Sequence, residues 1–312
     1  CLGWQVAIST DDAYGKARIM KINAELLDDR MKSGQVPVIA GFQGISPDNR
    51  VTTLGRGGTD TSAVALAAAL GADRCDIYTD VDGVYTADPR IVSDARKLEK
   101  ITYEEMLEMA SVGTKVLQTR AVEMAMKHSQ KVQVLSSFSD GSGTLVVDED
   151  EIVEKELVSG IAYSSDEAKV TLVKVLDKPG VAAAIFGPLA EANINVDMIV
   201  QNVSEDGKAT DLTFTVAQND LERTVAKIEE RHQDLGYGTL VHDSKVAKIS
   251  VIGVGMRSHA GVAQTMFQTL AEKGINIQVI STSEIKVSVL IEEQYTELAV
   301  RALHSAYALG TL

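Results

Sequence analysis

The chain has 312 residues, of which 45% are hydrophobic and 24% charged, so it can form two or three soluble domains with buried cores. Its formal net charge of −14 disfavours binding to nucleic acid or to anionic membranes, because both attract a surplus of lysine and arginine. No apolar stretch has the length of a membrane span and no signal peptide is evident, so we predict a cytoplasmic protein that binds small molecules.

The only cysteines, Cys1 and Cys75, cannot form a disulfide framework. Neither has a histidine or a second cysteine at metal-ligand spacing, so no metal ligands are assigned. Cys75 lies in an apolar run and is expected in a core. The chain opens at Cys1 in what resembles the middle of an element, and we therefore expect an N-terminal part of the first domain to be missing.

Between residues 16 and 146, helical periodicity alternates with short apolar strands, which is typical of a parallel, doubly wound sheet covered by helices. The predicted elements are, in chain order, a helix over 17–32, a strand over 36–42, a helix over 60–70, a strand over 75–79, a helix over 103–109, a helix over 116–127 and a strand over 132–136. Thr102 and Glu105 form a capping-box pattern at the start of the helix predicted over 103–109. The acidic run 148–151 indicates a domain boundary near residue 150.

The second half contains an internal repeat. Gly180 aligns with Gly261, 81 residues later, and the following pairs match without a gap: Val181/Val262, Phe186/Phe267, Leu189/Leu270, Asn195/Asn276 and Ile199/Ile280. Each copy reads strand, helix, strand, strand, helix, as in a ferredoxin-like βαββαβ unit, and 239–242 closes the first copy. The second copy lacks a last strand, which 157–164 could supply. We predict modules at 151–244 and 245–312.

The most specific motif is Gly55-Arg56-Gly57-Gly58-Thr59-Asp60, which runs into an apolar helix. Its glycines allow close backbone approach, Thr59 is a plausible N-cap, and the helix N-terminus favours an anion. Arg56 adds a planar fork suited to a carboxylate or phosphate. A tight strand-to-helix turn with a surface arginine is an equally open interpretation of the glycines alone.

Two further segments carry candidate binding residues. The loop from Thr79 to Arg90 follows a predicted strand, where Tyr85 could flank a base and Arg90 could reach phosphates, although a solvated acidic loop is the alternative. In Gly113-Thr114-Lys115-Val116, the ammonium of Lys115 lies near a predicted helix N-terminus, although most such lysines are merely exposed.

In this order and spacing, the three motifs resemble those of the aspartate kinases of the amino-acid kinase superfamily, and the resemblance continues through the repeated modules, which that family calls ACT domains. It covers essentially the whole chain. The resemblance implies part of a three-layer αβα kinase sandwich with a mainly parallel sheet over 1–150, followed by two ACT modules.

The resemblance also implies transfer of a phosphoryl group from ATP, with Mg²⁺, to the side-chain carboxylate of L-aspartate. The product would be 4-phospho-L-aspartate, for lysine and threonine biosynthesis. The implied residues are Arg56, Gly57, Gly58 and Thr59 for aspartate, Asp60 and Lys115 for catalysis, and Thr79, Asp80, Tyr85, Arg90, Lys115 and Val116 for ATP. The family's glycine-rich loop with a phosphate-binding lysine, and a later acidic residue, have no match here, so this chain alone is expected to have little or no activity.

For regulation, the resemblance implies lysine and/or threonine as effectors and a homo-oligomer assembled through the ACT modules. The implied effector contacts are Asp177, Gly180, Ala182, Asn195, Val196, Asp197 and Gln201 in the first module and Asn276 and Ser283 in the second. A plainer interpretation is that Asn195 and Asn276 end helices and cap strands.

Two other functions stay open at this point. The chain could be an amino-acid-sensing regulatory subunit that partners a complete kinase, or a kinase acting on glutamate or its acetyl derivative. The repeated modules disfavour the second. The sequence does not identify the inhibiting amino acid or the number of chains.

Overall fold

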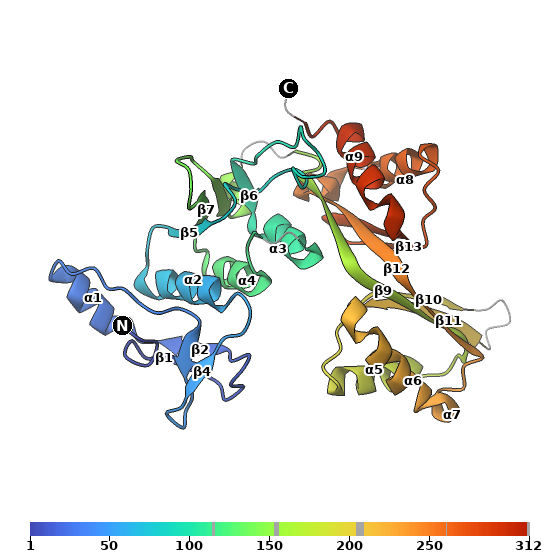
Figure 1. Ribbon diagram of the computed structural model, residues 1–312, viewed down its shortest axis with the longest axis horizontal. Helices are drawn as coiled ribbons and strands as arrows, with labels where there is room; N and C mark the ends of the chain where they lie inside the picture. Colours follow the sequence, from blue (N-terminus) through green and yellow to red (C-terminus); the bar gives the residue numbers. More distant parts are fainter. Residues whose placement is uncertain (114–115, 153–155, 204–208, 260, 311–312) are drawn as a thin grey trace. The chain divides into compact units, whose positions relative to one another are not determined.

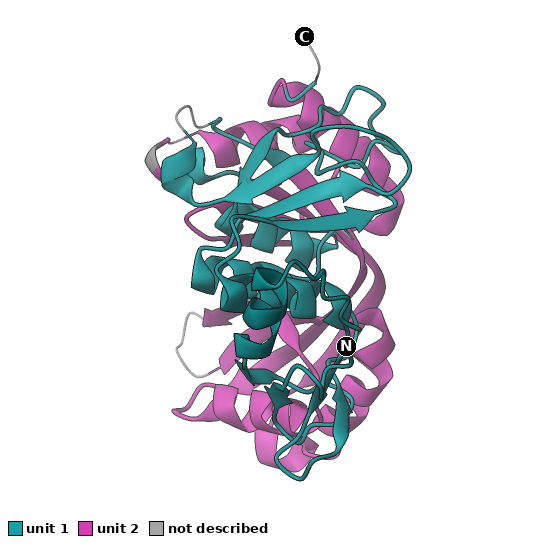
Figure 2. Ribbon diagram, turned by 90° about the vertical axis from the view of Figure 1, so that its left-hand side faces the viewer, with its two compact units in different colours: residues 1–160, 253–255, 309–312 teal, residues 161–252, 256–308 magenta. Residues whose placement is uncertain are grey.

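The computed structural model describes residues 1–113, 116–152, 156–203, 209–259 and 261–310 (Figure 1). They form two compact units, coloured separately in Figure 2. Unit 1 comprises Cys1–Gly160, Gly253–Gly255 and the C-terminal residues from Leu309, and unit 2 comprises Ile161–Ile252 and Met256–Ala308. Within the described ranges, no helix combines the length and apolar character needed to cross a membrane.

Unit 1 combines strands and helices in two four-stranded sheets, ordered β2-β1-β3-β4 and β5-β7-β8-β6. Its elements are β1 (Ile8–Thr10), β2 (Ile19–Ile22), α1 (Glu25–Lys32), β3 (Gln43–Ile45), β4 (Val51–Thr53), α2 (Gly58–Leu70), β5 (Cys75–Thr79), β6 (Lys100–Thr102), α3 (Tyr103–Val112), α4 (Thr119–His128), β7 (Val132–Ser136), β8 (Thr144–Val147) and the 3₁₀ turn η1 (Glu149–Glu151). Helix α2 packs against α4 and also contacts β2 and β5.

The expected α/β fold class of unit 1 is confirmed, and both of its sheets are mixed, with parallel and antiparallel strand pairs. β1–β3, β5–β7 and β6–β8 are parallel, whereas β1–β2, β3–β4 and β7–β8 are antiparallel. The antiparallel pairs are joined by short connections, which suffice for a hairpin, while a parallel pair needs a longer crossover.

The predicted strands 75–79 and 132–136 are confirmed as β5 and β7, and the predicted helices 60–70 and 103–109 are confirmed within α2 and α3. The helix predicted over 116–127 begins later, at Thr119.

Two predicted elements near the start of unit 1 are wrong. The helix expected over 17–32 begins only at Glu25, because Ile19–Ile22 pairs with β1 as a strand. Ile19 and Ile22 pack against Val6, Ile8 and Leu27, so tertiary pairing overrides the helical pattern. The strand expected over 36–42 is not formed. Its apolar residues Val36 and Val38 are 87% and 78% exposed, and Pro37 has no N–H to donate to a sheet.

A buried carboxylate organises the start of α3. Glu105 is 3% exposed, and its Oε2 accepts bonds from the N–H and the hydroxyl of Thr102, both at 3.1 Å, which confirms the capping box. Its Oε1 accepts from Ser159 Oγ at 2.5 Å and from the Val254 N–H at 3.0 Å. Glu105 therefore ties the N-terminus of α3 to two segments far away in the sequence.

Replacing Glu105 by alanine should lower the free energy of unfolding of unit 1 by about 3 kcal/mol, because two buried donors lose their acceptor and the helix loses its capping box. Urea unfolding can be followed through Trp4, the only tryptophan, which lies in unit 1. Glu123→Ala, an exposed change on α4, is the control and should stay within about 0.5 kcal/mol of the parent. Equal midpoints for the two variants would contradict the role of Glu105.

Unit 2 contains one six-stranded sheet, ordered β10-β11-β9-β12-β14-β13. Its elements are β9 (Gly160–Leu176, whose first residue belongs to unit 1), α5 (Val181–Glu191), β10 (Val196–Val203), β11 (Ala209–Val216), η2 (Gln218–Asp220), α6 (Leu221–Glu229), α7 (His232–Leu235), β12 (Thr239–Ile252), η3 (Val254–Ser258, which begins in unit 1), α8 (Val262–Glu272), β13 (Val279–Thr282), β14 (Lys286–Glu292), η4 (Glu293–Tyr295) and α9 (Thr296–Ala306). The two repeats thus share a sheet, in which β9 lies between β11 and β12.

The internal repeat is visible in the helices. α5 spans Val181–Glu191 and α8 spans Val262–Glu272, so the two correspond residue for residue at the spacing seen in the sequence. Each begins after a left-handed glycine, Gly180 with φ 91° and Gly261 with φ 117°. The core of the first repeat includes Phe214, whose ring meets that of Phe186 edge to face at 5.2 Å.

Candidate functional site

The glycine-rich loop lies between β4 and α2. Gly57 has φ 70° and is the N-cap of α2, which begins at Gly58. A Cβ on Gly57 would lie 1.8 Å from Cγ of Gln118, so this position requires glycine for both conformation and space. Thr59 lies exposed in the first turn, and its expected role as N-cap is wrong because the left-handed Gly57 already starts the helix.

The N-termini of α2 and α4 meet at Asp60. Its carboxylate accepts a hydrogen bond from the backbone N–H of Gln118, the N-cap residue of α4. Burial raises the pKa of the Asp60 carboxyl, and the Gln118 bond opposes this in part. Arg56 is exposed and forms no ion pair with any residue in the described ranges, so its guanidinium is available to a ligand beside two helix N-termini.

A second arginine at this junction was missed by the sequence analysis. Arg120, in the first turn of α4, donates from Nη1 to the Leu54 carbonyl at 2.5 Å and from Nη2 to the Ala17 carbonyl at 2.9 Å. A cation in the first turn of a helix is disfavoured by the helix dipole, and that unusual placement was the available signal.

The loop after β5 is organised around Asp82. Its carboxylate accepts from the Tyr85 hydroxyl at 3.0 Å and pairs with Lys97 Nζ at 3.2 Å. Burial opposes ionisation of Asp82, but the bonds from Lys97 and Tyr85 and the charge of Lys97 outweigh it and lower its pKa. Burial and the contact with Asp82 raise the pKa of Tyr85. Lys97 is another residue that sequence reasoning missed.

The remaining candidates of this loop lie on its surface. The Thr79 hydroxyl donates to Asp80 Oδ1 at 3.1 Å. Arg90, whose side chain is 85% exposed, donates from Nη2 to Asp88 Oδ2 at 2.7 Å. A second bond, from Nε to Asp88 Oδ1 at 3.0 Å, makes the pair bidentate, and the Asp88 side chain is only 16% exposed.

Of the third motif, Lys115 lies outside the described residues, together with Thr114. Val116 is half-buried in the turn before α4. The start of α4 thus meets the glycine-rich loop through Gln118, which lies against Gly57.

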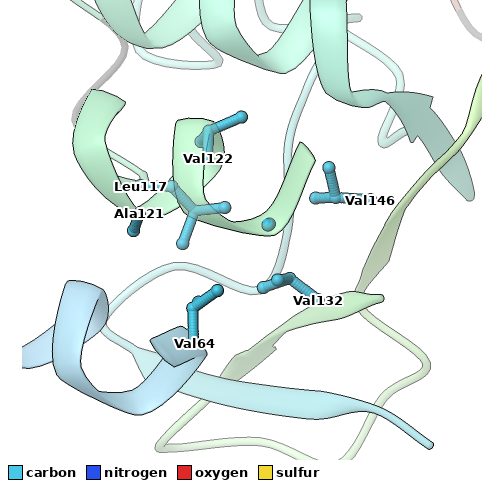
Figure 3. A pocket seen from close by; sticks show the side chains of 7 residues that line it. Val64, Leu117, Ala121, Val122, Val132 and Val146 are labelled. Atoms are coloured by element: carbon cyan, nitrogen blue, oxygen red, sulfur yellow. The ribbon is translucent and has the colours of Figure 1, made fainter. Parts of the chain in front are cut away.

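Within the described residues, no cluster of metal-ligating side chains lies at the site. No group of three His, Cys, Asp or Glu side chains is placed to hold a metal ion in the ranges that the structure covers. An apolar hollow lies in unit 1 among α2, α4, β7 and β8 (Figure 3), with no room for a water molecule and a lining of seven apolar residues: Val64, Leu117, Ala121, Val122, Ala125, Val132 and Val146. This hollow is part of the core packing.

In unit 2, the candidate effector residues fall in two groups. Asp177, Gly180 and Ala182 are exposed around the N-terminus of α5, and Asn195 and Gln201 are exposed before and on β10, which begins at Val196.

Asn276 and Ser283 are exposed on either side of β13. The C-caps of α5 and α8 are Ala192 and Lys273, so neither Asn195 nor Asn276 ends a helix, contrary to the plainer interpretation.

Asp197 has a partner within unit 2. Its Oδ2 lies 2.8 Å from Nζ of Lys248 on β12, and Lys248 also pairs with Glu167 of β9 at 2.7 Å. The side chains of Lys248 and Glu167 are 8% and 9% exposed. Burial alone would lower the pKa of Lys248, but the two carboxylates raise it. Burial likewise opposes ionisation of Asp197, yet Lys248 lowers its pKa.

Three family models match the chain. One described as the amino acid kinase family matches residues 3–136, and two described as ACT domains match 169–233 and 249–307. Together with the glycine-rich loop entering α2 and the two repeats of unit 2, they define an amino-acid kinase domain followed by two ACT domains.

Individual relatives narrow this class. The aspartate kinase of Pseudomonas fluorescens (strain SBW25) is 58% identical over 308 residues, which cover 98% of this chain and 74% of that protein. The aspartokinase of Mycolicibacterium smegmatis is 50% identical over 313 residues, covering 99% and 74%. The chain belongs to the aspartate kinase family, as the resemblance implied.

A solved structure supports the same assignment. E. coli aspartokinase III in complex with aspartate and ADP (R-state) aligns with a TM-score of 0.79 and 29% identity, over 98% of this chain and 69% of that one. The same enzyme in complex with lysine and aspartate (T-state) aligns with a TM-score of 0.76 and 28% identity, over the same shares.

Replacing Gly57 by alanine should lower the free energy of unfolding of unit 1 by roughly 3 kcal/mol, since the left-handed conformation and the contact with Gln118 both oppose a Cβ. Urea unfolding followed through Trp4 measures this. Gly15→Ala is the matched control, because a Cβ there meets nothing within 4 Å, and it should be neutral. A neutral Gly57→Ala would show that the loop has room that the structure does not give it.

Replacing Asp197 by asparagine should lower the stability of unit 2 at pH 7 by at most about 1 kcal/mol, because its side chain is 58% exposed. A carboxyl whose pKa is lowered by folding stabilises above its ordinary pKa, and this contribution is lost as the pH falls through the lowered value. The difference from the parent should therefore be full at pH 7 and vanish at an acid pH that lies below the lowered pKa of this carboxyl. Calorimetric unfolding at both pH values tests this, with the exposed Asp234→Asn as control; a difference that persists in acid would contradict it.

Proposed function

We propose that the chain carries out, as part of an aspartate kinase, transfer of the γ-phosphoryl group of ATP to the side-chain carboxylate of L-aspartate, giving 4-phospho-L-aspartate. The observation that carries this proposal is the exposed guanidinium of Arg56, which pairs with none of the residues that the structure describes and lies beside the N-termini of α2 and α4 in a loop that requires glycine.

The arrangement suits an anionic substrate. Helix N-termini present unpaired N–H groups and a partial positive charge, and a guanidinium can bind a carboxylate with two parallel hydrogen bonds. We assign the aspartate site to Arg56, Gly57, Gly58 and Thr59. Asp60, fixed by the Gln118 N–H, would orient cationic groups of the reactants. Such a site works by positioning and electrostatic stabilisation of charge on the transferring group.

The kinase family implies use of ATP, which we place at the loop after β5. Tyr85, held by Asp82, offers an aromatic edge for the nucleotide, and the largely exposed side chain of Arg90 can reach a phosphate. Thr79, Asp80, Lys115 and Val116 complete the proposed contacts. Mg²⁺ would enter with the phosphates of ATP, because the described residues offer it no three-ligand cage, and no catalytic step is assigned to it.

We further propose lysine and/or threonine as effectors of the two ACT domains. A solved relative was obtained with lysine and aspartate, which supports an amino acid as ligand. The exposed N-terminus of α5, with Asp177, Gly180 and Ala182, suits the charged ends of an amino acid. Strands β10 and β13 are the edges of the sheet, where a second copy could pair to form a homo-oligomer.

Isothermal calorimetry of the chain with aspartate, Mg-ATP, lysine and threonine tests the proposal. We expect saturable aspartate binding, which Arg56→Lys weakens at least about tenfold while changing ATP binding less than about twofold, because lysine keeps the charge but loses the fork. Arg74→Lys, on an exposed arginine paired with Asp76, is the control. Binding of glutamate as tight as that of aspartate, or no binding of aspartate, would contradict the substrate assignment; turnover in the same samples measures the low activity predicted from the sequence.

A further inference from the structure

Arg120 occupies an unfavourable place for a cation. It lies in the first turn of α4, where the helix dipole repels positive charge. Among the described residues it forms no ion pair, and its guanidinium donates to two backbone carbonyls, those of Leu54 and Ala17. The position is tolerated because these hydrogen bonds offset the unfavourable field.

The two carbonyls belong to the chain segments that frame the glycine-rich loop. Leu54, 0% exposed, immediately precedes Gly55, and its N–H donates to the Phe42 carbonyl at 2.9 Å. Ala17, also 0% exposed, donates its N–H to the Thr53 carbonyl at 3.0 Å. The Arg120 guanidinium therefore fastens the loop at Leu54, the residue that follows β4, in addition to these backbone bonds.

The same turn of α4 makes the other contacts of the junction. The side chain of Gln118 fills the space beside Gly57, and its backbone N–H donates to Asp60. Two residues further along the chain, Arg120 donates to the Leu54 carbonyl. Within the loop itself, from Leu54 to Gly58, the Gly58 N–H donates to the Gly55 carbonyl at 2.9 Å. Contacts with the start of α4 thus stabilise the shape of the loop more than hydrogen bonds within the loop do.

We propose that Arg120 is a positioning residue for the aspartate-binding loop: by holding the Leu54 and Ala17 carbonyls it sets the direction in which Arg56 and the N–H group of Gly57 face the substrate. This inference rests on the proposed function of the loop. The planar guanidinium suits the role, because two separate nitrogens reach two carbonyls, whereas an ammonium is a single point.

The test compares Arg120→Met, which keeps an apolar stem and loses both donors, with Arg120→Lys. Calorimetry should show aspartate binding weakened at least tenfold in Arg120→Met, partly recovered in Arg120→Lys, and ATP binding changed less than about twofold in both. Lys127→Met removes the same charge at the exposed end of α4 and should leave aspartate binding unchanged.

Hydrogen exchange measured by mass spectrometry makes the test independent of substrate binding. In Arg120→Met, peptides covering 54–58 should exchange at least about tenfold faster than in the parent, while β7 and β8 keep their protection. Unchanged exchange in 54–58, or equal loss of aspartate and ATP binding, overturns the proposal. If the parent chain fails to bind aspartate, the proposed function fails, and the exchange of 54–58 still decides whether Arg120 positions this loop.

Discussion

The site depends on bringing two helix N-termini together. Each carries a partial positive charge, so α2 and α4 repel one another where they meet unless negative charge lies nearby. The Asp60 carboxylate supplies some of it by accepting the Gln118 N–H, and Gly57 lacks the Cβ that would clash with the Gln118 side chain. What remains is a surplus of positive potential with an exposed arginine beside it. An anionic substrate therefore completes an electrostatic arrangement that the fold leaves unbalanced.

Buried charges serve a different purpose elsewhere in the molecule. Glu105 accepts bonds from Thr102, Ser159 and Val254, and Lys248 pairs with Glu167 and Asp197. Glu105 thus collects partners from three places in the sequence, and Lys248 from two. An apolar side chain could fill the same space, but it would not specify which segments meet, and that is where buried polar groups have their best-attested role.

Features of the sequence that act locally could be predicted. The capping box at Thr102 and Glu105 formed as expected, because both partners lie within one helical turn. The repeat of Gly180 and Gly261 was equally predictable, since both glycines have the positive φ that starts a helix here. The motif Gly55 to Asp60 could be predicted as a candidate site because its glycines, its arginine and the start of a helix lie within six consecutive residues.

Features that depend on partners far away in the sequence could not be predicted. Ile19–Ile22 became a strand only because β1 is available to pair with it, and the apolar residues near Val36 found no such partner. The N-cap was placed at Thr59 on side-chain chemistry, although backbone conformation at Gly57 decided the start of the helix. Arg120 escaped notice because its two carbonyl acceptors lie 66 and 103 residues away in the sequence.

The shared sheet of unit 2 bears on how this half of the chain can evolve. β12 runs without a break from Thr239 to Ile252, so the strand that ends one repeat also begins the next, and β9 is hydrogen-bonded to strands on both sides. When a structural unit is duplicated, one of the two copies can normally be lost or exchanged. Here neither copy can be lost without exposing an open sheet edge in the other, so the two repeats must be inherited together and can diverge only within the shared sheet.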